Sequence, residues 1–282
     1  MILVTGATGT VGRELVRILA ARGEQVRAIT RDPAKAESLS DGVEVVRADF
    51  TDPASLLDAA KGADAVFMLS APGPWIPQHD EAILAAARSA GVSRAVKLSA
   101  IGTGDKQHGT DWHLPGEKAL KSSGLAWTVL RPSSFASNAL SWANAISAGH
   151  PVPNPTGDGA QGVIDPADIA EVSAAALTTS DHDAATYTLT GPELLSTPSM
   201  AEILGRVIGR KIELVSLTPD DYREALTAAG LDADFVTTAA EGARMVASGG
   251  NAVVTGDVER ALGRPARTFA DWATANRAAF TA

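Results

Sequence analysis

The sequence predicts an α/β protein built on a doubly wound parallel β-sheet, and three observations support this prediction. Short apolar segments alternate with segments of helical periodicity through the first half of the chain. The apolar segments are rich in Val, Ile and Leu at nearly every position, as expected for parallel strands that helices cover on both faces. The connections are short, and strand–helix alternation with short connections is typical of a doubly wound sheet.

The expected elements follow from local signals. A first helix should follow the first strand closely, because apolar residues recur there at helical spacing and would pack on the sheet. Helix starts are expected at Asp52-Pro53 and at Asp165-Pro166, where an acidic N-cap precedes proline at the first helical position. Six strands are expected in this half of the chain: Ile2–Thr5, Gln25–Thr30, Val43–Ala48, Ala65–Ser70, Arg94–Ser99 and Trp127–Arg131.

The pattern changes after the sixth strand. A helix is expected over residues 134–148, whereas residues 150–159 are too rich in Pro and Gly for a regular element. The later elements should be strands at Thr186–Thr190 and Ile212–Leu217 and helices around residues 200–208, 219–229 and 235–247. We expect a core over residues 1–150 that takes back part of residues 160–190, and a smaller C-terminal α/β lobe mainly over residues 151–282.

Composition excludes several classes of function. The 282 residues include 24 Lys and Arg against 33 Asp and Glu, a formal charge of −9 with no basic run, so binding to nucleic acid by general attraction is not expected. No apolar stretch reaches the roughly 18 residues of a membrane span, and no charged leader precedes the first strand. We therefore expect a cytoplasmic protein. The absence of cysteine excludes disulfides, zinc–thiolate sites and thiol nucleophiles. The oligomeric state stays open, with a homodimer as one alternative.

A glycine-rich turn follows the first strand and opens an amphipathic helix. Gly6 would permit a tight turn, Gly9 would let the backbone approach a pyrophosphate, and Gly12 would allow close packing of the helix. The helix N-terminus would then present free N–H groups to the anion. A purely structural turn is the alternative, but strand, spacing and helix together predict a dinucleotide site in the core, as in the Rossmann fold, with the C-terminal lobe for the substrate. The residues expected to meet the cofactor here are Gly6, Thr8, Gly9, Thr10, Val11 and Gly12.

The end of the second strand bears on the choice between NADH and NADPH. An NAD site needs an acid there for the ribose 2′-hydroxyl, whereas this chain has Thr30 and Arg31. A guanidinium suits a 2′-phosphate. Asp32 could be the missing acid or the N-cap of a helix that starts at Pro33; we favour the cap and predict NADP as the cofactor, with NADPH preferred over NADH. The alternative for Arg31 is an ordinary solvated charge.

In an open α/β sheet the cofactor lies across the carboxyl ends of the strands. Asp49 and Phe50 end the third strand and are placed to meet the adenine, although Phe50 is nearly as well explained as core. The nicotinamide should reach the residues that end the fourth and fifth strands: Leu69, Ser70, Ala71 and Ser99.

Aromatic side chains could surround a flat substrate near the same edge. Trp75 lies in a Pro-rich loop after the fourth strand. The residues expected to contact substrate are Trp75, Trp112, Phe135, Asn138 and Trp142. Core packing is the alternative for each aromatic. Such a pocket has few fixed charges, and it fits a small apolar or aromatic carbonyl better than a sugar or an acid.

Motifs along the whole chain are shared with one protein family: Thr5–Gly12, the Arg31-Asp32-Pro33 turn, Val96–Ala100, His113-x-x-x-Glu117-Lys118, Ser123–Pro132 with Phe135 and Asn138, and Thr268–Trp272. On these motifs the sequence resembles the NmrA-like atypical short-chain dehydrogenase/reductases, and within them the NADPH-dependent quinone oxidoreductases. The first motif is shared by a very large superfamily, whereas the block from His113 to Asn138 is more specific. The resemblance implies a nicotinamide cofactor and oxidoreductase activity.

The Tyr-x-x-x-Lys pair that does acid–base work in the wider superfamily is absent. The chain has two tyrosines, Tyr187 and Tyr222, and neither has a lysine four residues later. The resemblance places His113 and Glu117 at the corresponding positions and matches Ser99 to the third catalytic residue. It therefore implies catalytic roles for His113 and Ser99.

The missing pair favours acceptors that need little general acid. A reduced ketone leaves an alkoxide that needs a proton at once, whereas a reduced quinone leaves a delocalised phenolate. His113, with an unperturbed pKa near 6.5, suits a proton donor around neutrality, or it hydrogen-bonds the nicotinamide ribose or packs on a helix. We predict an NAD(P)H-dependent reductase of a quinone or a similar conjugated carbonyl. The alternative is a non-catalytic, NAD(P)-binding redox-sensing regulator of the NmrA type.

Two other groups of polar residues have structural interpretations. Three potential metal ligands are irregularly spaced, and no metal site is expected from them: His108, Asp111 and His113. Residues 79–81, His-Asp-Glu, are expected in the first turn of a helix, where acids oppose the dipole. A four-residue spacing puts His113 and Glu117 on one helix face, unless Pro115 marks the helix start and leaves His113 in the loop before it.

Overall fold

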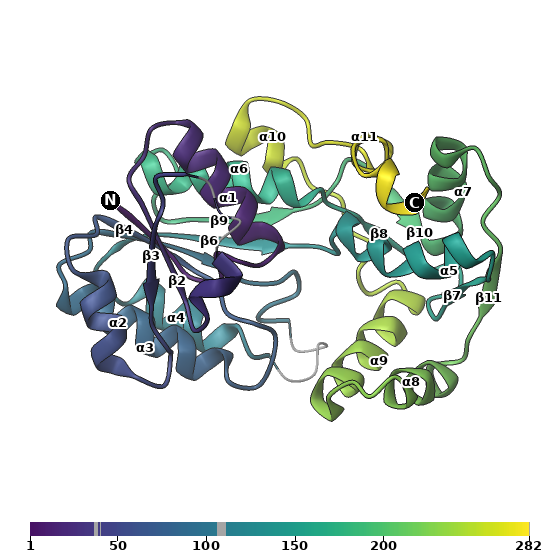
Figure 1. Ribbon diagram of the computed structural model, residues 1–282, viewed down its shortest axis with the longest axis horizontal. Coiled ribbons are helices and arrows are strands. Elements are labelled where there is room, and N and C mark those ends of the chain that lie inside the picture. The colour runs from purple at the N-terminus through teal and green to yellow at the C-terminus, as the bar shows by residue number, and fades with distance from the viewer. Residues whose placement is uncertain (37–38, 40, 106–110, 282) are drawn as a thin grey trace. The chain divides into compact units, whose positions relative to one another are not determined.

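The computed structural model describes residues 1–36, 39, 41–105 and 111–281. They form two compact units (Figure 1). The first unit comprises Met1–Pro132, Pro166–Leu189 and Arg260–Gly263, and the second comprises Ser133–Asp165, Thr190–Glu259 and Arg264–Ala282. A bridge between Phe135 and Ile164 lies within the second unit.

A sheet of seven strands forms the centre of the first unit, and every pairing in it is parallel. Its order is β3-β2-β1-β4-β5-β6-β9. The bounds are β1 Ile2–Val4, β2 Val26–Thr30, β3 Glu44–Arg47, β4 Ala65–Met68, β5 Arg94–Leu98, β6 Ala126–Pro132 and β9 Ala185–Leu189. The order reverses beside β1, and cofactors bind outside the carboxyl ends of the strands at such a point. The predicted doubly wound, Rossmann-like class is confirmed.

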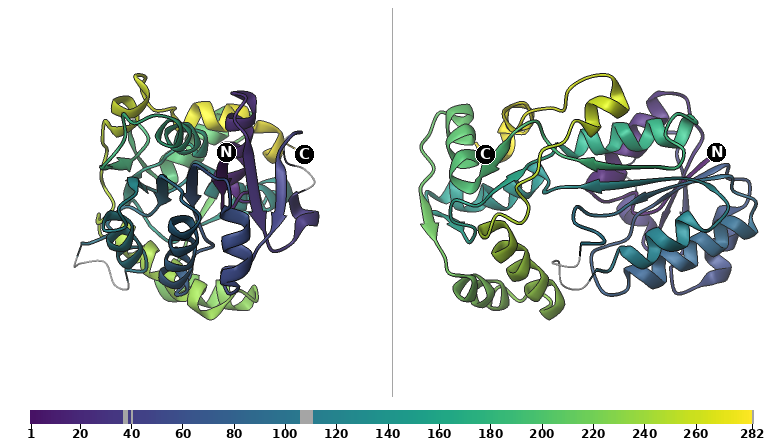
Figure 2. Two further views of the ribbon diagram at one scale, coloured as in Figure 1. Left: turned by 90° about the vertical axis from the view of Figure 1, so that its left-hand side faces the viewer. Right: turned by 180° about the vertical axis from the view of Figure 1, so that it is seen from behind.

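Helices cover both faces of this sheet. The bounds are α1 Thr10–Ala21, η1 Pro33–Ala36, α2 Pro53–Ala60, α3 Ile76–Ser89, α4 Leu114–Lys121 and α6 Pro166–Thr178. A further helix, α10 Asp257–Leu262, has residues in both units. Helices α1 and α6 pack together on one face, and α2, α3 and α4 lie side by side on the other, as the front and rear views agree (Figures 1 and 2). As predicted, Asp52 caps α2, and its carboxylate accepts from the N–H groups of Ala54 and Ser55.

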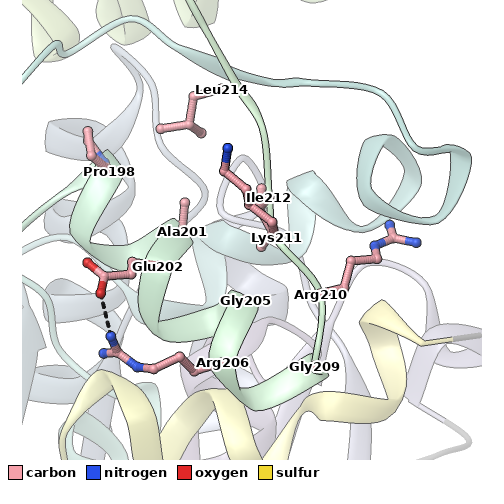
Figure 3. A pocket seen from close by; sticks show the side chains of 10 residues that line it. All are labelled: Pro198, Ala201, Glu202, Gly205, Arg206, Gly209, Arg210, Lys211, Ile212 and Leu214. Carbon is pink, nitrogen blue, oxygen red and sulfur yellow. Dashed lines mark hydrogen bonds and ion pairs between the residues drawn. The ribbon is translucent and has the colours of Figure 1, made fainter.

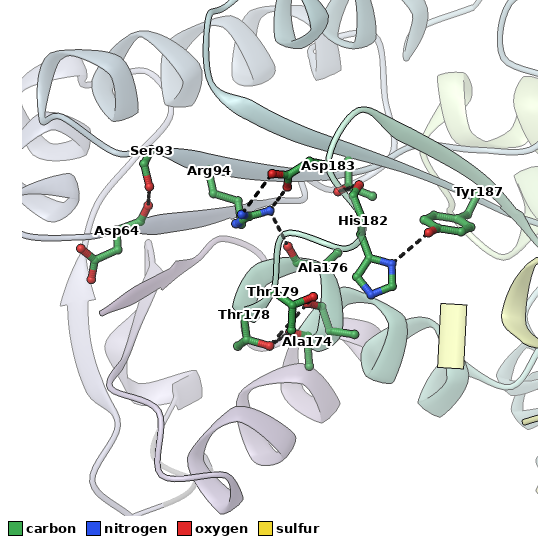
Figure 4. Close-up of polar contacts among 12 residues, drawn as sticks. Asp64, Ser93, Arg94, Ala174, Ala176, Thr178, Thr179, His182, Asp183 and Tyr187 are labelled. Atoms are coloured by element: carbon green, nitrogen blue, oxygen red, sulfur yellow. Dashed lines mark hydrogen bonds and ion pairs between the residues drawn. The ribbon is translucent and has the colours of Figure 1, made fainter. Parts of the chain in front are cut away.

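Polar contacts tie the late strand β9 and helix α6 into the first unit (Figure 4). The Arg94 guanidinium, at the start of β5, binds the Asp183 carboxylate and donates to the carbonyl of Ala176 at 3.4 Å. The buried His182 ring contacts the Tyr187 hydroxyl at 2.9 Å. These contacts explain why residues far along the chain belong to the sheet of the first unit.

The second unit contains short strands and helices. The bounds are η2 Ala136–Trp142, α5 Ala143–Ala148, β7 Val152–Asn154, β8 Ala160–Gly162, β10 Leu194–Ser196, α7 Thr197–Ile208, β11 Leu214–Ser216, α8 Pro219–Ala228, α9 Ala233–Ala247, α11 Phe269–Ala275 and η3 Arg277–Phe280. Strand β7 pairs with β11 in parallel, so the expectation of no regular element in residues 150–159 is wrong. Proline is tolerated there because the two strands form a sheet of their own with free edges. Among the described helices, none has the length and apolarity that crossing a bilayer requires.

Candidate cofactor and active site

The glycine turn lies between β1 and α1. Gly6 has φ +62°, a conformation that favours glycine, and its carbonyl accepts from the Gly9 N–H at 3.0 Å. A Cβ on Gly12 would lie 2.1 Å from the Gly6 carbonyl oxygen, so helix α1 can sit this close to the turn only because residue 12 has no side chain. The geometry agrees with the roles predicted for Gly6 and Gly12.

The N-terminus of α1 is open to an anion. Gly9 is its N-cap, has extended backbone angles and contributes no side-chain cap. Gly9 and Thr10 are exposed, whereas the side chain of Val11 is buried in the core, so Val11 would contact a ligand through its backbone. Free N–H groups at an exposed helix start suit a pyrophosphate, so these residues fit the predicted dinucleotide.

The end of β2 carries an exposed arginine and a capping aspartate. The Asp32 carboxylate accepts from the N–H of Ala34 at 3.2 Å, in the first turn of η1. The N-cap interpretation of Asp32 is therefore confirmed. The Arg31 side chain next to it is exposed, as binding to a ribose phosphate requires.

An aromatic stack follows β3 at the same edge of the sheet. The Phe50 ring stacks on His79 of α3, with centroids 4.3 Å apart and planes 9° from parallel. The Asp49 carboxylate accepts from the backbone and hydroxyl of Thr51, and these hydrogen bonds lower its pKa. Burial lowers the pKa of His79, whose Nδ1 is buried without a partner in the described residues. The sequence offered no signal for this stack, because its two rings lie on different elements.

The residues after β4 form a short loop that Trp75 closes. Thr5 at the end of β1 both donates to the Leu69 carbonyl, at 2.6 Å, and accepts from the Leu69 N–H. The Trp75 indole donates to the Ala71 carbonyl at 3.0 Å and lies against Gly73. Trp75 is 40% exposed, so core packing does not explain it.

A buried lysine follows in β5. Lys97 is 1% exposed, and its ammonium donates to the Asp80 carboxylate at 2.5 Å and lies 3.4 Å from Nδ1 of His113. Asp80 is itself buried in α3, and the first turn of this helix contains no acid, so the expectation that residues 79–81 form the first turn and oppose the helix dipole is wrong. Neither residue was predicted from the sequence to belong to the site. A lone lysine inside an apolar strand was the available signal.

A second buried network lies one helical turn further along α4. Glu117 is 1% exposed and accepts from the Ser99 hydroxyl at 2.6 Å and from two nitrogens of Arg131, at 2.9 and 2.6 Å. Burial opposes the charged form of Glu117, but the hydrogen bonds from Arg131 and Ser99 outweigh it, and its pKa is lowered. The Ser99 hydroxyl also contacts the Thr103 hydroxyl at 3.2 Å. Glu117 is therefore a fixed carboxylate, and Ser99 holds it in place.

His113 contacts Lys97 of the first network and precedes Glu117 of the second by one helical turn. It is the N-cap of α4, and Pro115 is the second residue of that helix. Burial and then the Lys97 charge lower the pKa of His113 to about 4. The pKa of this ring therefore lies below the unperturbed value near 6.5, because burial disfavours the imidazolium more than the nearby acids favour it.

The remaining candidates from this part of the sequence are Trp112 and the potential metal ligands Asp111 and His108. Trp112 is half-buried directly before His113. The Asp111 carboxylate accepts from the N–H groups of Gly104 and Leu114, and His108 lies outside the described residues. Over the described ranges, no cluster of three His, Cys, Asp or Glu is arranged for a metal ion.

Three substrate candidates belong to the second unit. Phe135 is half-buried and leads into η2, Trp142 ends η2 and packs partly against the core of that unit, and the exposed Asn138 amide donates to Ser134. A separate hollow of about 470 Å³ in this unit lies along α7 (Figure 3). The Arg206–Glu202 ion pair lines it, and none of the residues predicted from the sequence does.

Fold and site together define a dinucleotide-binding protein of the doubly wound α/β class. The chain belongs to the NAD(P)H-binding family, whose model matches residues 6–180. It is 38% identical to the (4-alkanoyl-5-oxo-2,5-dihydrofuran-3-yl)methyl phosphate reductase of Streptomyces griseus over 99% of each chain. It is 36% identical to the NAD(P)H azoreductase of Xenophilus azovorans over 100% of each chain.

A solved structure extends the likeness. The quinone oxidoreductase QOR2 of Escherichia coli, complexed with NADPH, superposes with a TM-score of 0.87 at 27% identity, over 98% of this chain and 99% of that one. The predicted resemblance to the quinone oxidoreductases is confirmed, as is the prediction of an NAD(P)H-dependent oxidoreductase. The alternative of a redox-sensing regulator draws no support from these relatives.

Proposed function

We propose that the protein transfers a hydride from NADPH to a quinone or a similar conjugated carbonyl. One observation carries the proposal. At the positions that the family resemblance assigns to the missing Tyr–Lys pair, the chain has a half-buried, neutral His113 and a Glu117 carboxylate bound by Arg131. Neither group has a proton to release at neutral pH. The acceptor must therefore form an oxyanion stable enough to take its proton from water, as a conjugated acceptor does.

The names of the relatives support this class of acceptor. They specify a quinone for one relative, azo compounds for another and an alkanoyl-oxo-dihydrofuran phosphate for a third.

Each part of the site has a proposed task. Bound NADPH would supply the hydride. The glycine turn would hold the pyrophosphate, Asp49 and Phe50 the adenosine, and Arg31 the 2′-phosphate. The residues proposed beside the nicotinamide are Leu69, Ser70, Ala71 and Ser99, and the exposed Trp75 and half-buried Trp112 would contact the acceptor.

The choice of NADPH over NADH is tested at Arg31. Arg31→Ala should raise the Kd for NADPH roughly 10- to 150-fold, because a hydrogen bond to a charged group contributes about 1.5–3 kcal/mol. The Kd for NADH, which has no 2′-phosphate, should barely change. Fluorescence titration measures both, with Arg22→Ala at the far end of α1 as the control. Equal losses for both cofactors would show that Arg31 does not bind the phosphate.

The protonation state of His113 predicts the pH dependence. With a pKa of about 4, His113 stays neutral throughout the range from pH 6 to pH 8.5, so its titration should not change kcat for a quinone there. If it were an acid of pKa 6.5, kcat would fall tenfold per pH unit above that value. Steady-state rates at saturating NADPH measure the profile, and His113→Phe should have the same shape. A wild-type decline that this variant abolishes would contradict the assignment.

A panel of acceptors tests the function itself. Purified protein should oxidise NADPH with quinones faster than with simple aldehydes and ketones. An azo dye and a phosphorylated unsaturated lactone extend the panel to the chemistry of the relatives. Binding of NADPH without turnover of any acceptor would overturn the proposal.

A further inference from the structure

The buried lysine of β5 has two partners from two other elements. Its Nζ donates to Asp80 of α3 at 2.5 Å and lies 3.4 Å from Nδ1 of His113, just before α4. A fully buried ammonium is rare and costly unless it is paired. A buried ion pair also adds little stability over apolar side chains of the same volume. The arrangement therefore calls for an explanation beyond stability.

We propose that Lys97, held by Asp80, is a positioning residue that keeps the neutral imidazole of His113 protonated on Nε2. In this tautomer the Nε2–H of His113 is the hydrogen-bond donor to the oxygen of the acceptor. This role rests on the function proposed above. His113 would then donate a hydrogen bond to the developing oxyanion without giving up its proton.

The ammonium group of Lys97 determines which ring nitrogen of His113 bears the proton. Lysine has three N–H donors and no acceptor, so the ring nitrogen that faces it can only accept. Nδ1 of His113 therefore has no proton, and the neutral ring must bear its proton on Nε2. An imidazolium would point an N–H at the ammonium and place two positive charges together. A neutral histidine can polarise a carbonyl oxygen as a hydrogen-bond donor.

The surrounding charges agree with a neutral ring. Lys97 lowers the pKa of His113, Asp111 before α4 and Glu117 within it raise it, and burial dominates. Asp80 contacts Lys97, the residue that in turn contacts the ring. Burial raises the pKa of Asp80, and the attraction of Lys97 opposes this change.

A glycine in α4 makes room for the aspartate. A Cβ on Gly116 would lie 2.1 Å from Oδ2 of Asp80, the same oxygen that accepts from Lys97. The packing of α3 against α4 at this point therefore depends on Gly116. Gly116→Ala would displace the carboxylate and change no titratable group, which gives an independent way to perturb Lys97.

Nuclear magnetic resonance of the wild-type protein without cofactor tests the tautomer directly. Histidine labelled with ¹⁵N would be observed at pH 7, and the signals of His113 are those that His113→Phe removes. We expect a protonated Nε2 and an unprotonated Nδ1. A proton on Nδ1, an imidazolium, or an average of the two tautomers would overturn the proposal. The tautomer is measured without any acceptor, so its result can be distinguished from a failure of the proposed function.

A variant then tests whether the tautomer matters for turnover. Asp80→Asn with Lys97→Met removes both charges together, so that no buried charge is left without its counterion. Its His113 should show both tautomers, and its kcat with a quinone should fall about tenfold, the effect of one orienting hydrogen bond. The Kd for NADPH should stay unchanged. Gly116→Ala should lower kcat in the same direction. The control is Lys61→Met, which breaks a Lys–Asp pair of 2.6 Å on the surface and should change nothing.

A double-mutant cycle separates positioning from stability. If Lys97 acts through His113, the paired substitution should not lower kcat further in a His113→Phe background. A structural role would instead give losses that multiply and a lower melting temperature that explains them. A paired variant with a single Nε2 tautomer, or with unchanged kcat, would also overturn the proposal.

Discussion

Gly12→Ala is expected to raise the Kd for NADPH at least tenfold and to lower the free energy of unfolding by about 1–3 kcal/mol, as overpacking does. The new Cβ would lie 2.1 Å from the Gly6 carbonyl oxygen and 2.9 Å from the Cα of Ala7. These are backbone atoms, so the turn or the whole of α1 must move. Either movement displaces the N–H groups proposed to hold the pyrophosphate. Fluorescence titration and thermal unfolding measure the two effects.

The same substitution at Gly242 is the control. Gly242 lies within α9, and a Cβ there meets no atom within 4 Å. Gly242→Ala should raise stability by up to about 1 kcal/mol, since alanine is the better helix former, and should leave cofactor binding unchanged. Normal NADPH affinity in Gly12→Ala would show that the turn is not the pyrophosphate site.

Glu117→Gln is expected to lower the free energy of unfolding at pH 7 by about 1.5–3 kcal/mol. The substitution keeps the shape of the side chain but removes the charge that accepts two hydrogen bonds from Arg131 and one from Ser99. The control is Glu202→Gln in the exposed pair with Arg206, which has the same 2.6 Å separation and should cost at most about 1 kcal/mol. Denaturant unfolding measures both variants, and equal effects would contradict the buried network.

The difference in the free energy of unfolding between wild type and Glu117→Gln should decrease as the pH falls. The folded pKa of Glu117 lies below its ordinary value of 4.5. The stabilisation is therefore fully present above pH 4.5 and is lost as the pH falls through the folded pKa. The advantage of the wild type should shrink in acid and stay constant from pH 6 to pH 8. A growing advantage in acid would contradict the direction of this pKa shift.

Local signals predicted most of the fold. The six early strands, the cap at Asp52 and the glycine turn each depend on neighbouring residues, and each lies where expected. The short strand β7 could not be predicted in this way. It exists because β11, more than 50 residues later, pairs with it, and its own sequence of Val-Pro-Asn opposes a strand.

The candidate site was predictable only in part. Residues on the turn and at the strand ends follow from topology, because parallel strands end at one edge. The partners of the buried groups do not. Asp80, Lys97 and His113 come from three elements, and the pKa of His113 depends on burial that no local pattern encodes. The sequence therefore located the histidine but could not indicate its protonation state.

Single-turnover transfer from isotopically labelled cofactor tests the central claim most directly. Protein saturated with NADPH that carries deuterium at one or the other prochiral position of C4 would be mixed with a quinone, and the loss of NADPH absorbance followed. Hydride transfer predicts that absorbance is lost only when the quinone is present and that one of the two labels slows the loss. No loss of absorbance from a saturated complex, or equal rates for unlabelled and both labelled cofactors with every acceptor tried, would contradict the account.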